Sequence, residues 1–161
     1  MSDSFWRTEV WHPLTVHFPI ALLIFSTLVF FVSLFFQESR KIQWQRFSTV
    51  ALIVGTVGAW LALYTGDLAD GVVARKICDP LILKDHEIAA QTSTYLFTAA
   101  SFLSIIIFYS EFLNTFKKIL VSILTVLMVG GCIYLALASH AGATLVYEQG
   151  AGVRDHEVDC K

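Results

Sequence analysis

The chain has 161 residues, a formal net charge of −2, 56% hydrophobic residues and a mean hydropathy of +0.67. This length suits one domain, but the composition is too apolar for a typical water-soluble one. The small net charge gives no indication of nucleic-acid binding. We therefore expect a protein whose surroundings are the lipid bilayer.

Four uncharged apolar runs predict membrane-spanning helices. They contain no Asp, Glu, Lys or Arg and cover residues 14–36, 47–65, 88–110 and 119–139. At a rise of about 1.5 Å per residue, each run crosses the roughly 30 Å of hydrocarbon with its backbone hydrogen bonds satisfied internally. Short connections at two of the three junctions favour antiparallel neighbours. The predicted fold is a single all-α domain, an up-down-up-down four-helix transmembrane bundle with its first and third helices diagonal, whose halves share only a hairpin pattern.

The charges outside the runs are unevenly distributed. Connections 37–46 and 111–118 have a net charge of +3, whereas both termini and the loop 66–87 together have −5. By the positive-inside rule, the short connections are cytoplasmic. The termini and the loop 66–87 are then periplasmic.

Two of the three cysteines fall on this predicted outer face. Cys78 and Cys160 lie outside the apolar runs, and Cys132 lies within the fourth. In an oxidising compartment, Cys78 and Cys160 are expected to form a disulfide that ties the tail to the long loop. A metal-binding or redox pair is the alternative, although neither belongs to a CxxC motif.

The histidines also lie on or near the outer face, at positions 12, 17, 86, 140 and 156. His17 is three residues inside the first run, His86 immediately precedes the third, and His140 immediately follows the fourth. These three approach one depth of the bundle from different helices, and ionisable groups at such depths are candidates for function. His12 precedes Pro13 and is expected in extended backbone before the helix. His156 is expected to be a solvated surface residue.

Three chemistries fit these histidines. A haem iron takes imidazoles from opposite sides, which His17 and His86 would supply from diagonal helices. A zinc or copper ion would need a larger set of ligands. The third chemistry is proton or quinone handling by a titrating imidazole. The zinc or copper set would be drawn from His12, His17, His86 and His140, with Asp67 or Asp70.

Structural roles remain open beside these chemistries. His17 could simply hydrogen-bond a backbone carbonyl or Thr15. His86 could belong to a polar helix entry with Asp85 as the N-cap.

Three segments resemble a bacterial family known as domain of unknown function 2231. They are HPLTVHFPIALL from His12 to Leu23, His86 at the start of the third helix, and GATLVYEQGAGV from Gly142 to Val153. The resemblance implies a four-helix protein of the bacterial inner membrane. The domain occurs beside cytochrome c modules in some members, which implies a redox context.

We therefore expect a small b-type cytochrome-like subunit that carries haem b near the periplasmic face. His17 and His86 would be the axial ligands, with His12 or His140 as alternates. It would pass electrons between redox partners, such as a quinone, a cytochrome c or another membrane redox subunit. No residue is expected to break bonds, so an electron-transfer or accessory subunit fits better than a stand-alone enzyme. The alternatives are a non-haem metal-binding protein and a non-enzymatic subunit that docks a partner.

Overall fold

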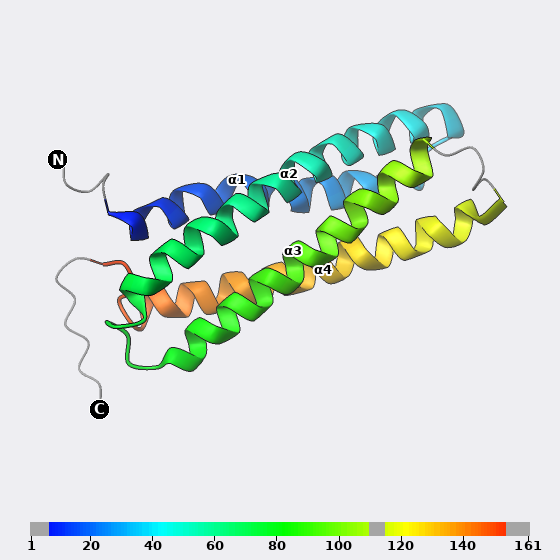
Figure 1. Cartoon of the computed structure of the whole chain (residues 1–161). Coiled ribbons are helices and arrows are strands. Elements are labelled where there is room, and N and C mark those ends of the chain that lie inside the picture. Colours follow the sequence, from blue (N-terminus) through cyan, green and yellow to red (C-terminus); the bar gives the residue numbers. More distant parts are fainter. Residues whose placement is uncertain (1–6, 110–114, 154–161) are drawn as a thin grey trace.

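Four long helices make up the computed structural model, which describes residues 7–109 and 115–153. The helices are α1 (Thr8–Ser33), α2 (Glu38–Val73), α3 (Pro80–Tyr109) and α4 (Lys117–Tyr147) (Figure 1). Each is long and apolar enough to cross a membrane, and the described residues contain no strand. The predicted all-α bundle of four membrane-spanning helices is therefore confirmed.

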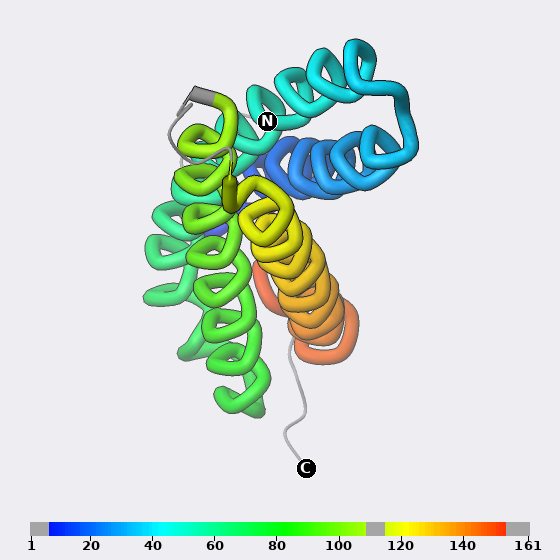
Figure 2. Tube along the Cα trace, turned by 90° about the vertical axis from the view of Figure 1, so that its right-hand side faces the viewer, coloured from blue at the N-terminus to red at the C-terminus, as the bar shows by residue number. Residues whose placement is uncertain are grey.

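The bundle is built from two helical hairpins. Helix α1 packs along α2 and α3 packs along α4, whereas the hairpins touch each other less, mainly through α2 and α3. Figure 2 shows the α1–α2 hairpin beside the α3–α4 hairpin. Helices α1 and α3 barely touch, as expected for a diagonal pair. We call the end that holds residues 74–79 the loop end, and the end that holds residues 34–37 the turn end.

The helices continue past the charge-free runs at the loop end. Helix α2 reaches Val73 and α3 begins at Pro80, so most of the predicted loop 66–87 is helical and the connection is short. Helix α4 likewise continues eight residues beyond the predicted run, to Tyr147. A charge-free run marks only the part of a helix that lies in hydrocarbon, and polar turns can extend the same helix into the interface.

The chain after α4 turns back on itself at the loop end. Gly150 has a φ of 63°, a left-handed conformation that glycine adopts without steric cost. The Ala151 amide then donates a 2.9 Å hydrogen bond to the Leu145 carbonyl. The Asp79 amide donates to Oε1 of Gln149 at 2.9 Å, which joins this segment to the α2–α3 connection.

The middle of the bundle holds large buried side chains opposite glycines. Leu23 is 1% exposed and lies against Gly55, where an added Cβ would be 3.0 Å from its Cδ2 atom. Phe97 is 0% exposed and lies against Gly131, where a Cβ would be 2.8 Å from the ring. Small residues allow membrane helices to approach closely. These two contacts fix how tightly each hairpin closes.

Buried hydroxyls bond to backbone carbonyls, because hydrocarbon offers them no water. Ser93 Oγ donates to the Gly131 carbonyl across α3 and α4 at 2.9 Å. Ser48 Oγ donates to the Ser26 carbonyl across α1 and α2 at 2.7 Å. Each hairpin therefore has at least one hydrogen bond between its own helices.

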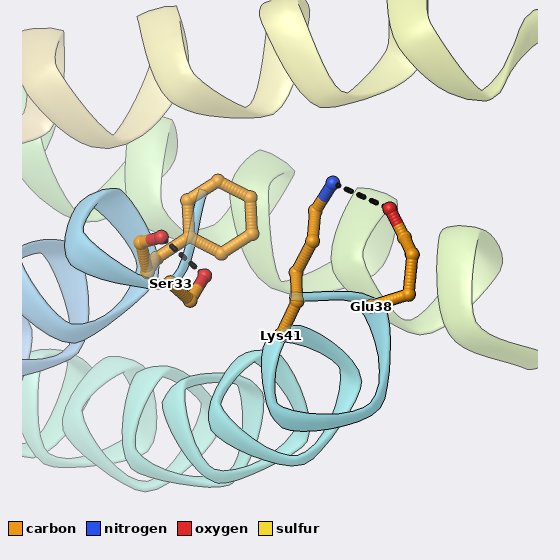
Figure 3. A network of polar contacts seen from close by, with 4 residues as sticks. Ser33, Glu38 and Lys41 are labelled. Atoms are coloured by element: carbon orange, nitrogen blue, oxygen red, sulfur yellow. Dashed lines mark hydrogen bonds and ion pairs between the residues drawn. The ribbon is translucent and has the colours of Figure 1, made fainter. Parts of the chain in front are cut away.

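At the turn end too, a buried hydroxyl bonds to a backbone carbonyl (Figure 3). The Ser33 hydroxyl donates to the Phe30 carbonyl in the last turn of α1. Lys41 and Glu38 form an ion pair at 3.4 Å in the first turn of α2. Glu38 is largely exposed, and a pair of this kind contributes little to stability.

The contact of Phe97 with Gly131 can be tested against its immediate neighbour. Gly131→Ala should lower the free energy of unfolding by about 1–3 kcal/mol, because a methyl group would overlap a fully buried ring. Gly130→Ala is the matched control, since its Cβ would meet only Leu96 at 3.6 Å. Thermal unfolding in detergent measures both; equal melting temperatures for the two variants would contradict this packing.

Candidate functional site

Helix α1 is continuous through His12 and Pro13. The expectation that His12 lies in extended backbone before the helix is wrong, because α1 begins at Thr8 and includes Pro13 and Pro19. A proline removes one helical hydrogen bond, and membrane helices tolerate this loss. Residues 12 and 17 then point about 140° apart. His12 turns into the bundle, and His17 is exposed.

His12 is held by the backbone of α2. Its Nδ1 atom lies 3.0 Å from the Ala62 carbonyl oxygen. A carbonyl only accepts hydrogen bonds, so Nδ1–H is the donor and Nε2 carries the lone pair of the neutral ring. Gly66 lies beside the ring, where an added Cβ would be 3.2 Å from Cε1 and 3.3 Å from Nδ1.

His86 is held by α4 in the same way. Its Nδ1–H donates to the Ala138 carbonyl at 2.8 Å. Gly142 lies beside this ring, with a Cβ position 3.1 Å from Cε1 and 3.2 Å from Nδ1. Nε2 of His86 therefore also carries the lone pair in the neutral ring.

The spacing of alanine and glycine explains how each carbonyl becomes available. In a helix, the carbonyl of residue i accepts the amide of residue i+4, yet it has a second lone pair. The side chain at i+4 normally covers the turn before it. Glycine at positions 66 and 142 leaves the carbonyls of Ala62 and Ala138 open to an imidazole.

The two imidazoles meet between the hairpins, toward the loop end of the bundle. The ring centroids of His12 and His86 are 6.0 Å apart, and the ring planes are nearly perpendicular at 84°. One ring comes from each hairpin, from the diagonal helices α1 and α3. The structure therefore brings His12, rather than His17, into contact with His86.

A cavity of about 730 Å³ surrounds the histidine pair, within the size range of ligand pockets. It extends from Leu23 and Leu135 in the middle of the bundle to Val153 near the loop end. Its walls come from all four helices and are mostly apolar. His17 and Gln91 also line it.

Acidic residues line the cavity toward the loop end. Glu9 pairs with Arg7 at 2.8 Å, and Glu87 pairs with Lys84 at 3.0 Å. Asp67 is exposed, whereas Oδ1 of Asp70 is buried and has no hydrogen-bond partner among the described residues. The cavity is therefore apolar toward the middle of the bundle and has acidic side chains, two of them ion-paired, in its part near the loop end.

One family matches the chain across nearly all of this structure. Residues 9–155 match the family described as a predicted membrane protein, DUF2231. The chain belongs to the DUF2231 family. No curated protein and no solved structure matches it. The matched range contains His12, His86 and the four alanine and glycine positions that hold them.

The other predicted residues of this DUF2231 chain do not join the pair, although His17 lines the same cavity. His17 donates from Nδ1 to the Pro13 carbonyl of its own helix at 2.7 Å. His140 is exposed and does not line the cavity. Within residues 7–109 and 115–153, no three His, Cys, Asp or Glu side chains are grouped to hold a metal ion. The larger zinc or copper set is therefore not assembled among these residues.

The cysteines and the last histidine are only partly described. Cys78 is disulfide-bonded and Cys132 is free. Cys160 and His156 lie outside the described residues. The pairing of Cys78 with Cys160 stays a prediction.

The residues that hold the histidines were not predicted. Ala62 and Gly66, like Ala138 and Gly142, are spaced four apart and so share one helix face. Two such pairs near the ends of the second and fourth apolar runs were the available signal. It is a weak signal, since small residues at this spacing are common in membrane helices.

The unpartnered carboxylate oxygen of Asp70 is expected to weaken the fold. Asp70→Asn should raise the free energy of unfolding by about 1 kcal/mol, because it removes a poorly solvated charge close to Asp67 and Glu87. Asp67→Asn, at an exposed position one turn away, should change it much less. Melting temperatures in detergent check both; destabilisation by Asp70→Asn would contradict the unpartnered state.

Proposed function

We propose that the protein is a small membrane redox subunit that binds haem b between His12 and His86. The observation that supports this proposal is the pair of imidazoles, contributed by separate hairpins, each with Nδ1–H bonded to a backbone carbonyl. Haem-binding histidines need Nε2 free for iron, and a hydrogen bond at the other ring nitrogen sets the tautomer and orientation.

The distance between the rings agrees with one shared metal ion. With metal–nitrogen bonds of about 2 Å, two imidazoles on opposite sides of an ion have ring centres about 6 Å apart. The observed centroid distance is 6.0 Å. His12 and His86 would suffice to hold a haem iron, whereas zinc sites usually need three or four protein ligands.

The cavity supports a planar apolar cofactor. It lies where the two hairpins meet, and the hairpins contact each other less than the helices within each do. Bound haem would supply reversible one-electron transfer. The protein's part would be to fix both imidazoles, to exclude water with Leu23 and Leu135, and to set the charge near the loop end with Asp67 and Asp70.

The surroundings of the cavity indicate where electron partners would approach. Apolar walls next to lipid suit a quinone, and acidic residues at the loop end suit a basic partner surface such as that of a cytochrome c. We propose residence in the bacterial inner membrane with the loop end periplasmic. The net charge of +3 in residues 37–46 and 111–118 supports this orientation.

The absorption spectrum of the purified protein tests the haem proposal. The full chain, expressed with added haem, should show a Soret band and a sharpened α band on reduction. His12→Ala and His86→Ala should each abolish the low-spin spectrum, because each would remove one of the two residues that are proposed to hold the iron. His17→Ala and His140→Ala are the matched controls and should retain it.

Two results would overturn this assignment. A parent protein without a Soret band would exclude haem and favour a non-haem metal site or a partner-docking subunit, which elemental analysis separates. Loss of the spectrum in His17→Ala but not in His12→Ala would instead establish His17 and His86 as the ligands.

Orientation has an independent test. A C-terminal fusion to alkaline phosphatase, which is active only outside the cytoplasm, should be active because the loop end is proposed to be periplasmic. The same reporter placed between Ser33 and Glu38 should be inactive. The reverse pattern would place the histidine pair near the cytoplasm.

A further inference from the structure

The two hairpins hold their histidines with the same contacts in the same order. In the first, His12 bonds to the carbonyl of Ala62, 50 positions later, and lies beside Gly66. In the second, His86 bonds to the carbonyl of Ala138, 52 positions later, and lies beside Gly142. In both, the histidine is on the first helix of the hairpin and the alanine and glycine are on the second.

The correspondence continues into the core. Eleven residues after each histidine stands a fully buried large side chain, Leu23 or Phe97. Each of these packs on a glycine, Gly55 or Gly131, located seven residues before the alanine that binds the histidine. Three residues before each of these glycines, a further large side chain is 1% exposed in both hairpins, Leu52 and Met128.

The helices that carry these matched positions also run in matching directions. Helices α1 and α3 both run from the loop end to the turn end, and α2 and α4 both return. The hairpins are thus related by an approximate rotation about the long axis of the bundle. The axis passes between the rings of His12 and His86.

We infer that the chain contains two copies of one histidine-holding hairpin, in which Gly66 and Gly142 are the positioning residues. Each glycine acts through its histidine, by leaving open the carbonyl to which the imidazole is bonded. The ligand class rests on the proposed function: a ligand gripped by two equivalent half-sites has two equivalent faces, as a metalloporphyrin has. The pairing of each glycine with its own histidine does not depend on that ligand.

A double-mutant cycle on the full-length protein tests the pairing without any cofactor. Gly66→Ala should lower the melting temperature, because its Cβ would lie 3.2 Å from the His12 ring. In a His12→Ala background the same change should have no further effect, since the atoms it would meet are gone. In a His86→Ala background, Gly66→Ala should still lower the melting temperature by the full amount. Gly142→Ala should show the corresponding pattern: its effect on the melting temperature should disappear in a His86→Ala background and persist in a His12→Ala background.

Matched glycines on the same helices serve as controls. Gly71→Ala on α2 meets nothing within 4 Å, and Gly130→Ala on α4 makes only an ordinary contact, so neither should interact with either histidine. The inference is overturned if His12→Ala leaves the effect of Gly66→Ala unchanged, or if Gly66→Ala has no effect. If Gly66→Ala alone does not accumulate, accumulation of the double variant with His12→Ala supports the inference, and its failure to accumulate overturns it.

A spectroscopic measurement then separates this inference from the proposed function. In haem-loaded protein, Gly66→Ala and Gly142→Ala should each weaken haem retention about tenfold and add a high-spin component, because partners that orient a ligand contribute affinity of that order. Gly71→Ala and Gly130→Ala should keep the parent spectrum. A parent without a Soret band refutes the proposed function, while the double-mutant cycle still decides the duplication. Loaded parent protein with unchanged glycine variants refutes the positioning role alone.

Discussion

The site depends on a hydrogen bond from an imidazole Nδ1–H to a backbone carbonyl that already serves a helix. Inside a membrane an imidazole cannot rely on water, so its orientation is set by whichever acceptor the neighbouring helix leaves open. Ala62 and Ala138 provide such acceptors because glycine follows each by one turn. The two Nε2 atoms are then left for a ligand, and the cavity between the hairpins gives that ligand space.

The architecture follows from how strongly each pair of helices can associate. Glycines in the second helix of each hairpin let Leu23 and Phe97 fill the space between its helices, and buried hydroxyls add bonds between those helices. The two hairpins meet over a less extensive surface. A cavity at this seam therefore costs less packing than one inside a hairpin would, and the histidines project into it from opposite sides.

Much of the fold could be predicted from the sequence, because charge-free runs report directly on burial in hydrocarbon. The diagonal placement of the first and third helices followed from those runs, and so did the position of His86 at the loop end of the third helix. Which of His12 and His17 lies beside His86 did not follow, since it depended on whether helix geometry persists through Pro13. The alanines and glycines that hold the rings act through backbone atoms, and the identity of a side chain carries little information about an exposed carbonyl. The internal repeat is also not apparent from the amino-acid sequence, because equivalent positions hold different residue types. Examples are Leu23 and Phe97, and Leu52 and Met128.

Each histidine is bonded within its own hairpin, so the orientation of each ring and the distance between the rings are set by different parts of the structure. The orientation of a ring is fixed locally, by α2 for His12 and by α4 for His86. The distance between the rings is fixed by how far apart the hairpins stand. A force that spreads or closes the seam, such as lateral pressure from the surrounding lipids, therefore acts on the gap between the imidazoles while leaving each ring bonded to its carbonyl.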